Sequence, residues 1–254
     1  RVDAVLKAPD HRVQARIAAE RSAVLLKNDG VLPLSPARAK RIAVIGPLGA
    51  SPQDMLGPWT TTADRDETVT ILDGLRAKAG CARCVTYAPG VQIARLYPSE
   101  FDNDYGAKEE PWSPAKAAAQ FKAAIALARR SDVVIATLGE AYNMAGENAS
   151  RGSLSLPGNE QRLLEALVAT GKPVVVVLLS GRPLDLEWAS THVPAILEAW
   201  YPGSQGGHAV ANLLFGDAVP GGKLPFTWPR HVGQVPAIYG HYPTMRGEES
   251  HRRT

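Results

Sequence analysis

Residues 132–139 (DVVIATLG) and 173–180 (PVVVVLLS) decide the fold of this 254-residue chain. Both runs are almost continuously apolar and rich in β-branched residues, which is typical of strands that are covered on both faces. The segment between them, 157–170, favours a helix, because it opens on a proline and Gly171 follows its end. A helix between two such strands predicts a parallel pair joined by a crossover.

The same alternation of strands and helices continues on both sides of this unit. Further strands are predicted at 41–46, 85–88 and 194–200, and further helices at 69–78, 113–130, 184–190 and 206–215. A first helix is predicted from about His11 to Lys27, ended by Asn28-Asp29-Gly30. We therefore predict an α/β fold, a layered sandwich of five or six mostly parallel strands flanked by helices, with an N-terminal linker helix.

Composition and charge exclude several classes of function. Hydrophobic residues make up 45% of the chain and charged residues 21%, which is a globular profile. The net charge of +3 is far from the clustered basic surface of a nucleic-acid-binding protein. No run of 18 apolar residues occurs, so we expect no transmembrane helix and no membrane partner. The charged N-terminus has no apolar signal-peptide core.

Cys81 and Cys84 are the only cysteines, and they form a C-x-x-C pair. Such a pair can be a redox couple or half of a zinc site, but no second Cys or His pair lies at zinc-ligand spacing. We expect incidental cysteines, loosely paired at most, and no metal site. A flavodoxin-like redox or nucleotide domain stays open as an alternative, although the chain has no glycine fingerprint for it.

Three loops follow predicted strands at the edge where open parallel sheets bind ligands. The loop after 41–46 (GPLGASPQDMLGPW) lacks both phosphate-binding glycine patterns, and Ser204 in YPGSQGG lacks the G-x-S-x-G context of a nucleophile. The loop after 132–139 contains Glu140, Glu147 and Arg151, and carboxylic acids there are suited to acid/base chemistry. A solvated Glu147 with no chemical role is the alternative interpretation.

Motifs along nearly the whole chain occur in a recognisable order. They are ERSAVLLKNDGVLPL (20–34), RIAVIGPLG (41–49), GPWTTTADRDETVTILDGL (57–75), VTYAPG (85–90), SDVVIATLGE (131–140), GENASRGSLSLPGNEQ (146–161), PVVVVLLSGRPLDL (173–186), the segment 198–229 and HYPTMR (241–246). Together they resemble the C-terminal α/β sandwich domain of glycoside hydrolase family 3, especially that of bacterial periplasmic β-glucosidases.

The resemblance implies an active site shared by two domains. In this family an N-terminal β/α barrel carries the catalytic nucleophile, an Asp in a G-F-V-x-S-D-W-type motif, and the sandwich domain supplies the general acid/base. By motif position that acid/base is Glu147, and Ser150 and Arg151 match the polar pair after it, which shapes the loop or contacts substrate. Trp59 matches an aromatic segment near the aglycone, where its ring either stacks on sugar or packs internally. No metal or organic cofactor is implied.

The chain also departs from the family pattern. The nucleophile motif is absent, and Ser131-Asp132 instead begins an apolar strand. We therefore interpret residues 1–30 as a linker helix from a missing barrel and 31–254 as the sandwich domain, incomplete at its C-terminal end. The parent would be a retaining β-glucosidase that removes terminal non-reducing β-D-glucosyl residues, whereas this fragment alone would be inactive.

The resemblance also implies partners and a location. The substrate would be a β-linked oligosaccharide or an aryl glucoside, and the missing barrel would be an intramolecular partner. A periplasmic or secreted location follows from the resemblance, and a homo-oligomer is left open. The alternative function is a non-catalytic carbohydrate-binding or scaffold domain that kept the fold.

Overall fold

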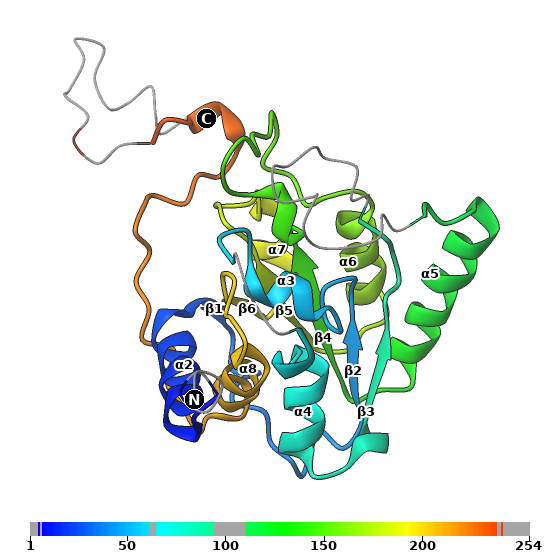
Figure 1. Cartoon of the computed structure of the whole chain (residues 1–254). Coiled ribbons are helices and arrows are strands. Elements are labelled where there is room, and N and C mark those ends of the chain that lie inside the picture. Colours follow the sequence, from blue (N-terminus) through cyan, green and yellow to red (C-terminus); the bar gives the residue numbers. More distant parts are fainter. Residues whose placement is uncertain (1–4, 6, 61–64, 94–109, 238–239, 241–254) are drawn as a thin grey trace.

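The computed structural model describes residues 5, 7–60, 65–93, 110–237 and 240. The HYPTMR segment and residues 94–109 lie outside the described residues. A six-stranded sheet with the order β1-β6-β5-β4-β2-β3 forms the centre of the molecule (Figure 1). Its strands are β1 (Val24–Asn28), β2 (Ile42–Ile45), β3 (Val85–Ala88), β4 (Val133–Gly139), β5 (Val174–Leu179) and β6 (Ala195–Glu198). The predicted mostly parallel α/β sandwich is confirmed.

Helices cover both faces of this sheet. The helices are α2 (Pro9–Ser22), α3 (Pro52–Leu56), α4 (Ile71–Ala79), α5 (Pro114–Arg129), α6 (Glu160–Val168), α7 (Glu187–His192) and α8 (Gly206–Phe215). Within the described ranges there are also four short 3₁₀ turns: η1 (Arg65–Glu67), η2 (Ala82–Cys84), η4 (Tyr142–Met144) and η5 (Val232–Gln234). The helices α4 and α8 pack together on one face, and α5, α6 and α7 lie on the other (Figure 1). None of the described helices is long and apolar enough to cross a bilayer.

The core consists of two apolar clusters, one on each face of the sheet. Alternate residues of β5 enter different clusters: Val175 and Val177 pack toward α4 and α8, whereas Val174 and Val176 pack toward α5 and α6. This two-residue alternation follows from the pleat of a strand, and it explains why β5 must be apolar at every position. All six residues of β5 are buried.

The first predicted helix is too long. Helix α2 ends at Ser22, and residues 24–28, which the sequence analysis assigned to the linker helix, form β1. This strand pairs antiparallel with β6, from Val24 opposite Glu198 to Asn28 opposite Ala195. Pairing with a distant strand overrides the approximately helical spacing of Val24 and Leu25, because backbone hydrogen bonds and burial outweigh local propensity.

Other differences from the predicted elements are small. Helix α6 begins at Glu160, three residues after Pro157, and α7 is shifted toward the C-terminus. Helix α3, which the sequence analysis missed, begins after Ser51, whose hydroxyl accepts a hydrogen bond from the Asp54 amide.

Cys81 and Cys84 form a disulfide across η2, so they are paired rather than incidental.

Because β2 to β6 are parallel, their carboxyl ends share one edge of the sheet, the upper edge in Figure 1. The loops after β2, β4, β5 and β6 all begin there. This edge is where the candidate site is expected.

Candidate functional site

Glu147 lies in the long loop that follows β4 at the carboxyl edge of the sheet. Its side chain is exposed, and it occupies a turn next to Asn148, whose φ of 57° is in the left-handed region that asparagine tolerates. The carboxylate is therefore accessible to a ligand that approaches this edge. The structure thus places the predicted acid/base on the surface, in a loop with a defined backbone.

Glu140, at the start of the same loop, is a buried ionic centre. Its side chain is fully buried, and its carboxylate accepts hydrogen bonds from two arginines. Arg151 Nη1 lies 2.8 Å from Glu140 Oε1, and Arg182 Nε lies 3.1 Å from Oε2. A buried charge needs such partners, since an unpaired one would be expensive to desolvate. The three residues therefore form a closed ion-pair group beneath the loop.

The arginines also hold the loop backbone. Arg182 Nη2 donates to the carbonyl oxygens of Met144, at 2.5 Å, and Ala149, at 2.9 Å. Arg151 Nη2 donates to the carbonyl oxygen of Ser155 at 2.9 Å. The carbonyls of Met144 and Ala149, on either side of Glu147, are thus both bonded to Arg182 of this ion-pair group.

The other predicted site residues differ in their surroundings. Ser150 is exposed on the same loop as Glu147. The Arg151 side chain is only 9% exposed, because its guanidinium is engaged by Glu140 and Ser155. Trp59 is 68% exposed and lies in the segment after α3, on a different loop of the same edge. The structure therefore brings Glu147, Ser150 and Arg151 onto one loop and places Trp59 on a neighbouring one.

Tyr201 and Asp54 connect these loops. The Tyr201 hydroxyl donates to the Ala141 carbonyl at 3.3 Å, and a Cβ added to Gly57 would meet the Tyr201 side chain at 2.7 Å. Asp54 Oδ1 accepts a hydrogen bond from the Tyr142 amide at 3.0 Å. The segment that carries Trp59 and the loop that carries Glu147 are therefore attached to the same residues.

Two further carboxyl groups, those of Glu160 and Glu198, are buried beside the carboxyl edge of the sheet. Burial raises the pKa of Glu160 well above the usual range, an effect that the Gly139 amide partly offsets by donating to Glu160 Oε2 at 3.0 Å. Burial likewise raises the pKa of Glu198, although the Trp200 amide and the Ser180 hydroxyl donate to its oxygens. Both groups therefore favour the neutral acid, since burial disfavours the charged form.

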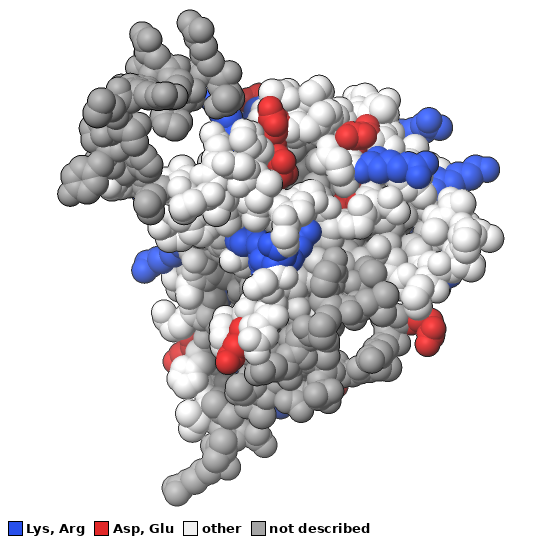
Figure 2. Space-filling view, turned by 90° about the horizontal axis from the view of Figure 1, so that it is seen from above, with Lys and Arg blue, Asp and Glu red and all other residues white. Residues whose placement is uncertain are grey.

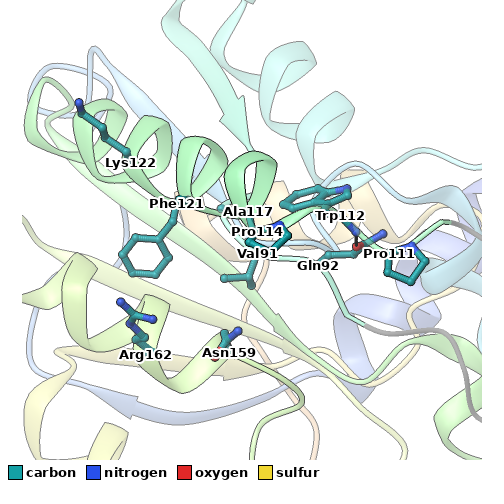
Figure 3. Close-up of a pocket in the computed structure, with 12 residues that line it drawn as sticks. Val91, Gln92, Pro111, Trp112, Pro114, Ala117, Phe121, Lys122, Asn159 and Arg162 are labelled. Carbon is teal, nitrogen blue, oxygen red and sulfur yellow. Dashed lines mark hydrogen bonds between the residues drawn. The ribbon is translucent and has the colours of Figure 1, made fainter.

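A cavity of about 540 Å³ lies to one side of this edge, between α5 and α6 (Figure 3). Its lining includes Trp112, Phe121 and Arg162, and none of the four predicted site residues. The Arg162 guanidinium lies 5.2 Å from the centre of the Phe121 ring, and Lys116 covers the Trp112 ring at the same distance. Both rings thus have cation–π partners, and the cavity is separate from the candidate site because it shares no lining residue with it.

Figure 2 looks down on the molecule from the side of the carboxyl edge. Among the described residues on this face, acidic and basic side chains are interspersed with uncharged surface, and neither sign dominates. Such a face is compatible with a neutral ligand. Among the described residues, no three His, Cys, Asp or Glu side chains come together as a metal-binding group.

Arg182 is one of the residues of this site that the sequence motifs do not identify. It lies in the matched segment LLSGRPLDL, but that motif alone assigns no role to the arginine. One signal in the sequence is its position: a cation three residues beyond a uniformly apolar strand, at the edge where the other parallel strands also end. Its partner Glu140 is 42 positions away in the sequence, and this contact was not predictable from spacing.

Comparisons with known proteins agree with the fold and the motifs. The model of the glycosyl hydrolase family 3 C-terminal domain matches residues 23–253. A periplasmic β-glucosidase of Salmonella typhimurium is 42% identical over 240 residues, which cover 93% of this chain and 31% of that protein. A β-xylosidase of Formosa agariphila is 38% identical over 243 residues, covering 94% of this chain and again 31% of the relative.

Solved structures give the same result. A β-glucosidase from Erythrobacter marinus superposes with a TM-score of 0.78 at 37% identity, covering 96% of this chain and 33% of that chain. The β-glucosidase from Listeria innocua in complex with isofagomine gives a TM-score of 0.78 at 31% identity, covering 96% and 30%. The chain spans about a third of the length of the relatives it matches. It belongs to glycosyl hydrolase family 3 and corresponds to the C-terminal domain of that family.

Proposed function

We propose that this chain forms part of the active site of a retaining β-glucosidase and that Glu147 is its general acid/base. The observation that carries the proposal is the position of Glu147. It is an exposed carboxylate in the GENASR motif, at the carboxyl edge of the sheet, on a loop whose backbone is bonded to a buried ion-pair group. An acid/base needs both access to substrate and a fixed position.

The chemistry requires a second carboxylate. Retaining glycosidases use two carboxyl groups about 5–5.5 Å apart, one on each side of the scissile bond. One attacks the anomeric carbon and forms a glycosyl-enzyme while the other protonates the leaving oxygen. The second group then takes a proton from the incoming water, which releases the sugar with its original configuration. We assign the protonating role to Glu147 and the nucleophile to an N-terminal barrel outside this chain.

The proposed substrates are β-linked oligosaccharides and aryl glucosides, from which terminal non-reducing β-D-glucosyl residues are removed. The β-glucosidase relatives support this choice, although one relative of similar identity is a β-xylosidase. We propose that the N-terminal barrel, which would enclose most of the sugar, makes the choice between a glucoside and a xyloside. The exposed Ser150 and Trp59 would contact substrate from this domain, whereas Arg151 would shape the loop.

We also propose a periplasmic or secreted location. One relative is named as periplasmic. The disulfide between Cys81 and Cys84 supports the same conclusion, since such bonds persist mainly in oxidising compartments.

Glu147→Ala in the complete protein tests the proposed role. With a β-glucoside that has a poor leaving group, we expect kcat to fall about 10²- to 10⁴-fold, because bond cleavage then lacks its proton donor. A substrate with a dinitrophenyl leaving group needs no protonation and should retain rapid glycosylation. Azide should partly restore turnover by replacing the water that Glu147 activates.

Glu187→Ala is the matched control, since it removes an exposed carboxylate from α7 that has no proposed role. It should leave the kinetics of both substrates unchanged. Normal kinetics in Glu147→Ala would exclude this residue as the acid/base.

A further inference from the structure

Arg182 connects to the segment around Glu147 on both of its sides. Its Nη2 atom donates to the Met144 carbonyl, three residues before Glu147, and to the Ala149 carbonyl, two residues after it. A single guanidinium therefore closes the turn in which the acid/base lies. We propose that Arg182 is a positioning residue for Glu147, an inference that rests on the function proposed above for that residue.

The buried Glu140 carboxylate fixes the guanidinium itself. Arg182 Nε lies 3.1 Å from Glu140 Oε2, and Arg151 binds the other oxygen at 2.8 Å. Glu140 is fully buried directly after β4, so its position follows that of the sheet. The sheet therefore fixes the position of Glu140, and Glu140 in turn fixes the orientation of the Arg182 guanidinium that binds the loop.

The backbone before Arg182 allows little movement. A Cβ added to Gly181 would lie 2.7 Å from the Ala145 Cβ and 3.3 Å from the Tyr201 ring. The chain that carries Arg182 is therefore packed against the first residues of the turn. Tyr201 in turn bonds the Ala141 carbonyl, which ties the beginning of the loop to the segment after β6. The turn is held from two neighbouring strand ends.

The arrangement needs an arginine rather than any cation. The guanidinium presents nitrogens in a planar fork, so Nε can bind Glu140 while Nη2 binds the two carbonyls. A lysine keeps the charge but offers one nitrogen, which cannot serve both ends of this geometry. Because a misplacement of about 1 Å in a catalytic group can cost about 10²-fold in rate, loss of the fork should reduce protonation of the leaving group.

Arg182→Lys and Arg182→Gln in the complete protein test the inference, with aryl β-D-glucosides of increasing leaving-group pKa as substrates. We expect kcat/KM to fall about 10- to 100-fold for poor leaving groups and to change little for dinitrophenyl glucoside. In Glu147→Ala, adding Arg182→Lys should cause no further loss, since the group being positioned is already absent. Circular dichroism identifies the folded variants, and one folded variant is sufficient. Arg129→Lys, an exposed arginine of α5, is the control and should leave the dependence on leaving group unchanged.

The outcomes separate the two proposals. If Glu147→Ala has normal kinetics, the proposed function fails. If Glu147→Ala behaves as an acid/base variant while folded Arg182 variants lose rate equally for all leaving groups, or lose rate additively with Glu147→Ala, the positioning role is overturned. If neither Arg182 variant folds, amide hydrogen exchange in Gly181→Ala decides the question. The added Cβ would press on Ala145 and displace the backbone that carries Arg182. The positioning role therefore requires faster amide exchange at residues 145–149 in this variant, and an unchanged exchange rate there contradicts the inference.

Discussion

Glu160 has a buried carboxyl group whose surroundings favour its protonated form. Its Oε2 accepts a hydrogen bond from the Gly139 amide, and within the described part of the chain its buried Oε1 has no hydrogen-bond partner. Burial raises its pKa, and the Gly139 amide and Arg151 lower it less than burial raises it. The folded chain therefore keeps this proton at a pH where an unfolded glutamate has lost it.

The pH dependence follows from this difference. A group with a raised pKa in the folded state contributes stability below its unfolded pKa, about 4.3 for glutamate, and loses it as the pH rises toward the folded value. Glu160→Gln stays neutral throughout, so we expect the variant to lose less stability than the wild type between pH 5 and pH 8. Urea denaturation at both values measures this.

Glu165→Gln makes the same chemical change at an exposed position of α6 and serves as the control. If Glu160→Gln shows the same change in unfolding midpoint between the two pH values as the wild type, the folded chain does not hold the Glu160 proton above pH 5, and its pKa is not raised.

At the scale of elements, the contact between α4 and α8 depends on two glycines. A Cβ on Gly74 would lie 2.0 Å from the Gly207 carbonyl oxygen, and a Cβ on Gly207 would lie 2.0 Å from the Thr70 carbonyl oxygen. The two helices therefore approach with backbone against backbone. Thr70 also caps α4, because its hydroxyl accepts from the Asp73 amide. Thr70 therefore both caps α4 and lies at the close contact with Gly207 of α8.

We expect Gly207→Ala to destabilise the fold by about 1–3 kcal/mol, as in other overpacked interiors. At an exposed helix position, replacing glycine by alanine would stabilise the fold by about 1 kcal/mol. A net loss of stability in Gly207→Ala therefore identifies the close contact as its cause. Thermal denaturation measures the change. Gly221→Ala is the control, because the nearest atom to its added Cβ is 3.8 Å away. Equal stability of both variants would show that the helices can separate at no cost.

The same scale shows how far the sequence could predict this fold. The buried strands are readable because covering by helices on both faces demands apolar residues throughout, as in β4 and β5. Strand β1 was not readable, because its conformation depends on pairing with β6 about 170 residues later. The site divides similarly: Glu147 lies in a local motif, whereas the contact of Glu140 with Arg182 arises from two separate loops.

At the scale of the whole molecule, the chain holds one half of the proposed chemistry. It spans about a third of relatives such as the Salmonella protein. A retaining mechanism needs two carboxylates on opposite sides of the sugar. Glu147 accounts for one of them in our proposal, and the G-F-V-x-S-D-W-type motif, to which the resemblance assigns the other, is absent from the sequence.

A mechanism-based label tests where the second carboxylate of our proposal lies. We expect 2,4-dinitrophenyl 2-deoxy-2-fluoro-β-D-glucoside to modify the complete protein, because its carboxylate nucleophile displaces dinitrophenolate and forms an ester to the anomeric carbon. The fluorine slows hydrolysis of that ester, so peptide mass spectrometry can find it.

The labelled peptide should lie outside residues 1–254, and the isolated chain should take no label and show no measurable turnover of aryl glucosides. A label on a residue of this chain, or turnover by the chain alone, would place the nucleophile within it and contradict the two-domain site. Labelling of Glu147→Ala at the same outside peptide would show that the two carboxylates act separately, since a dinitrophenyl leaving group needs no protonation.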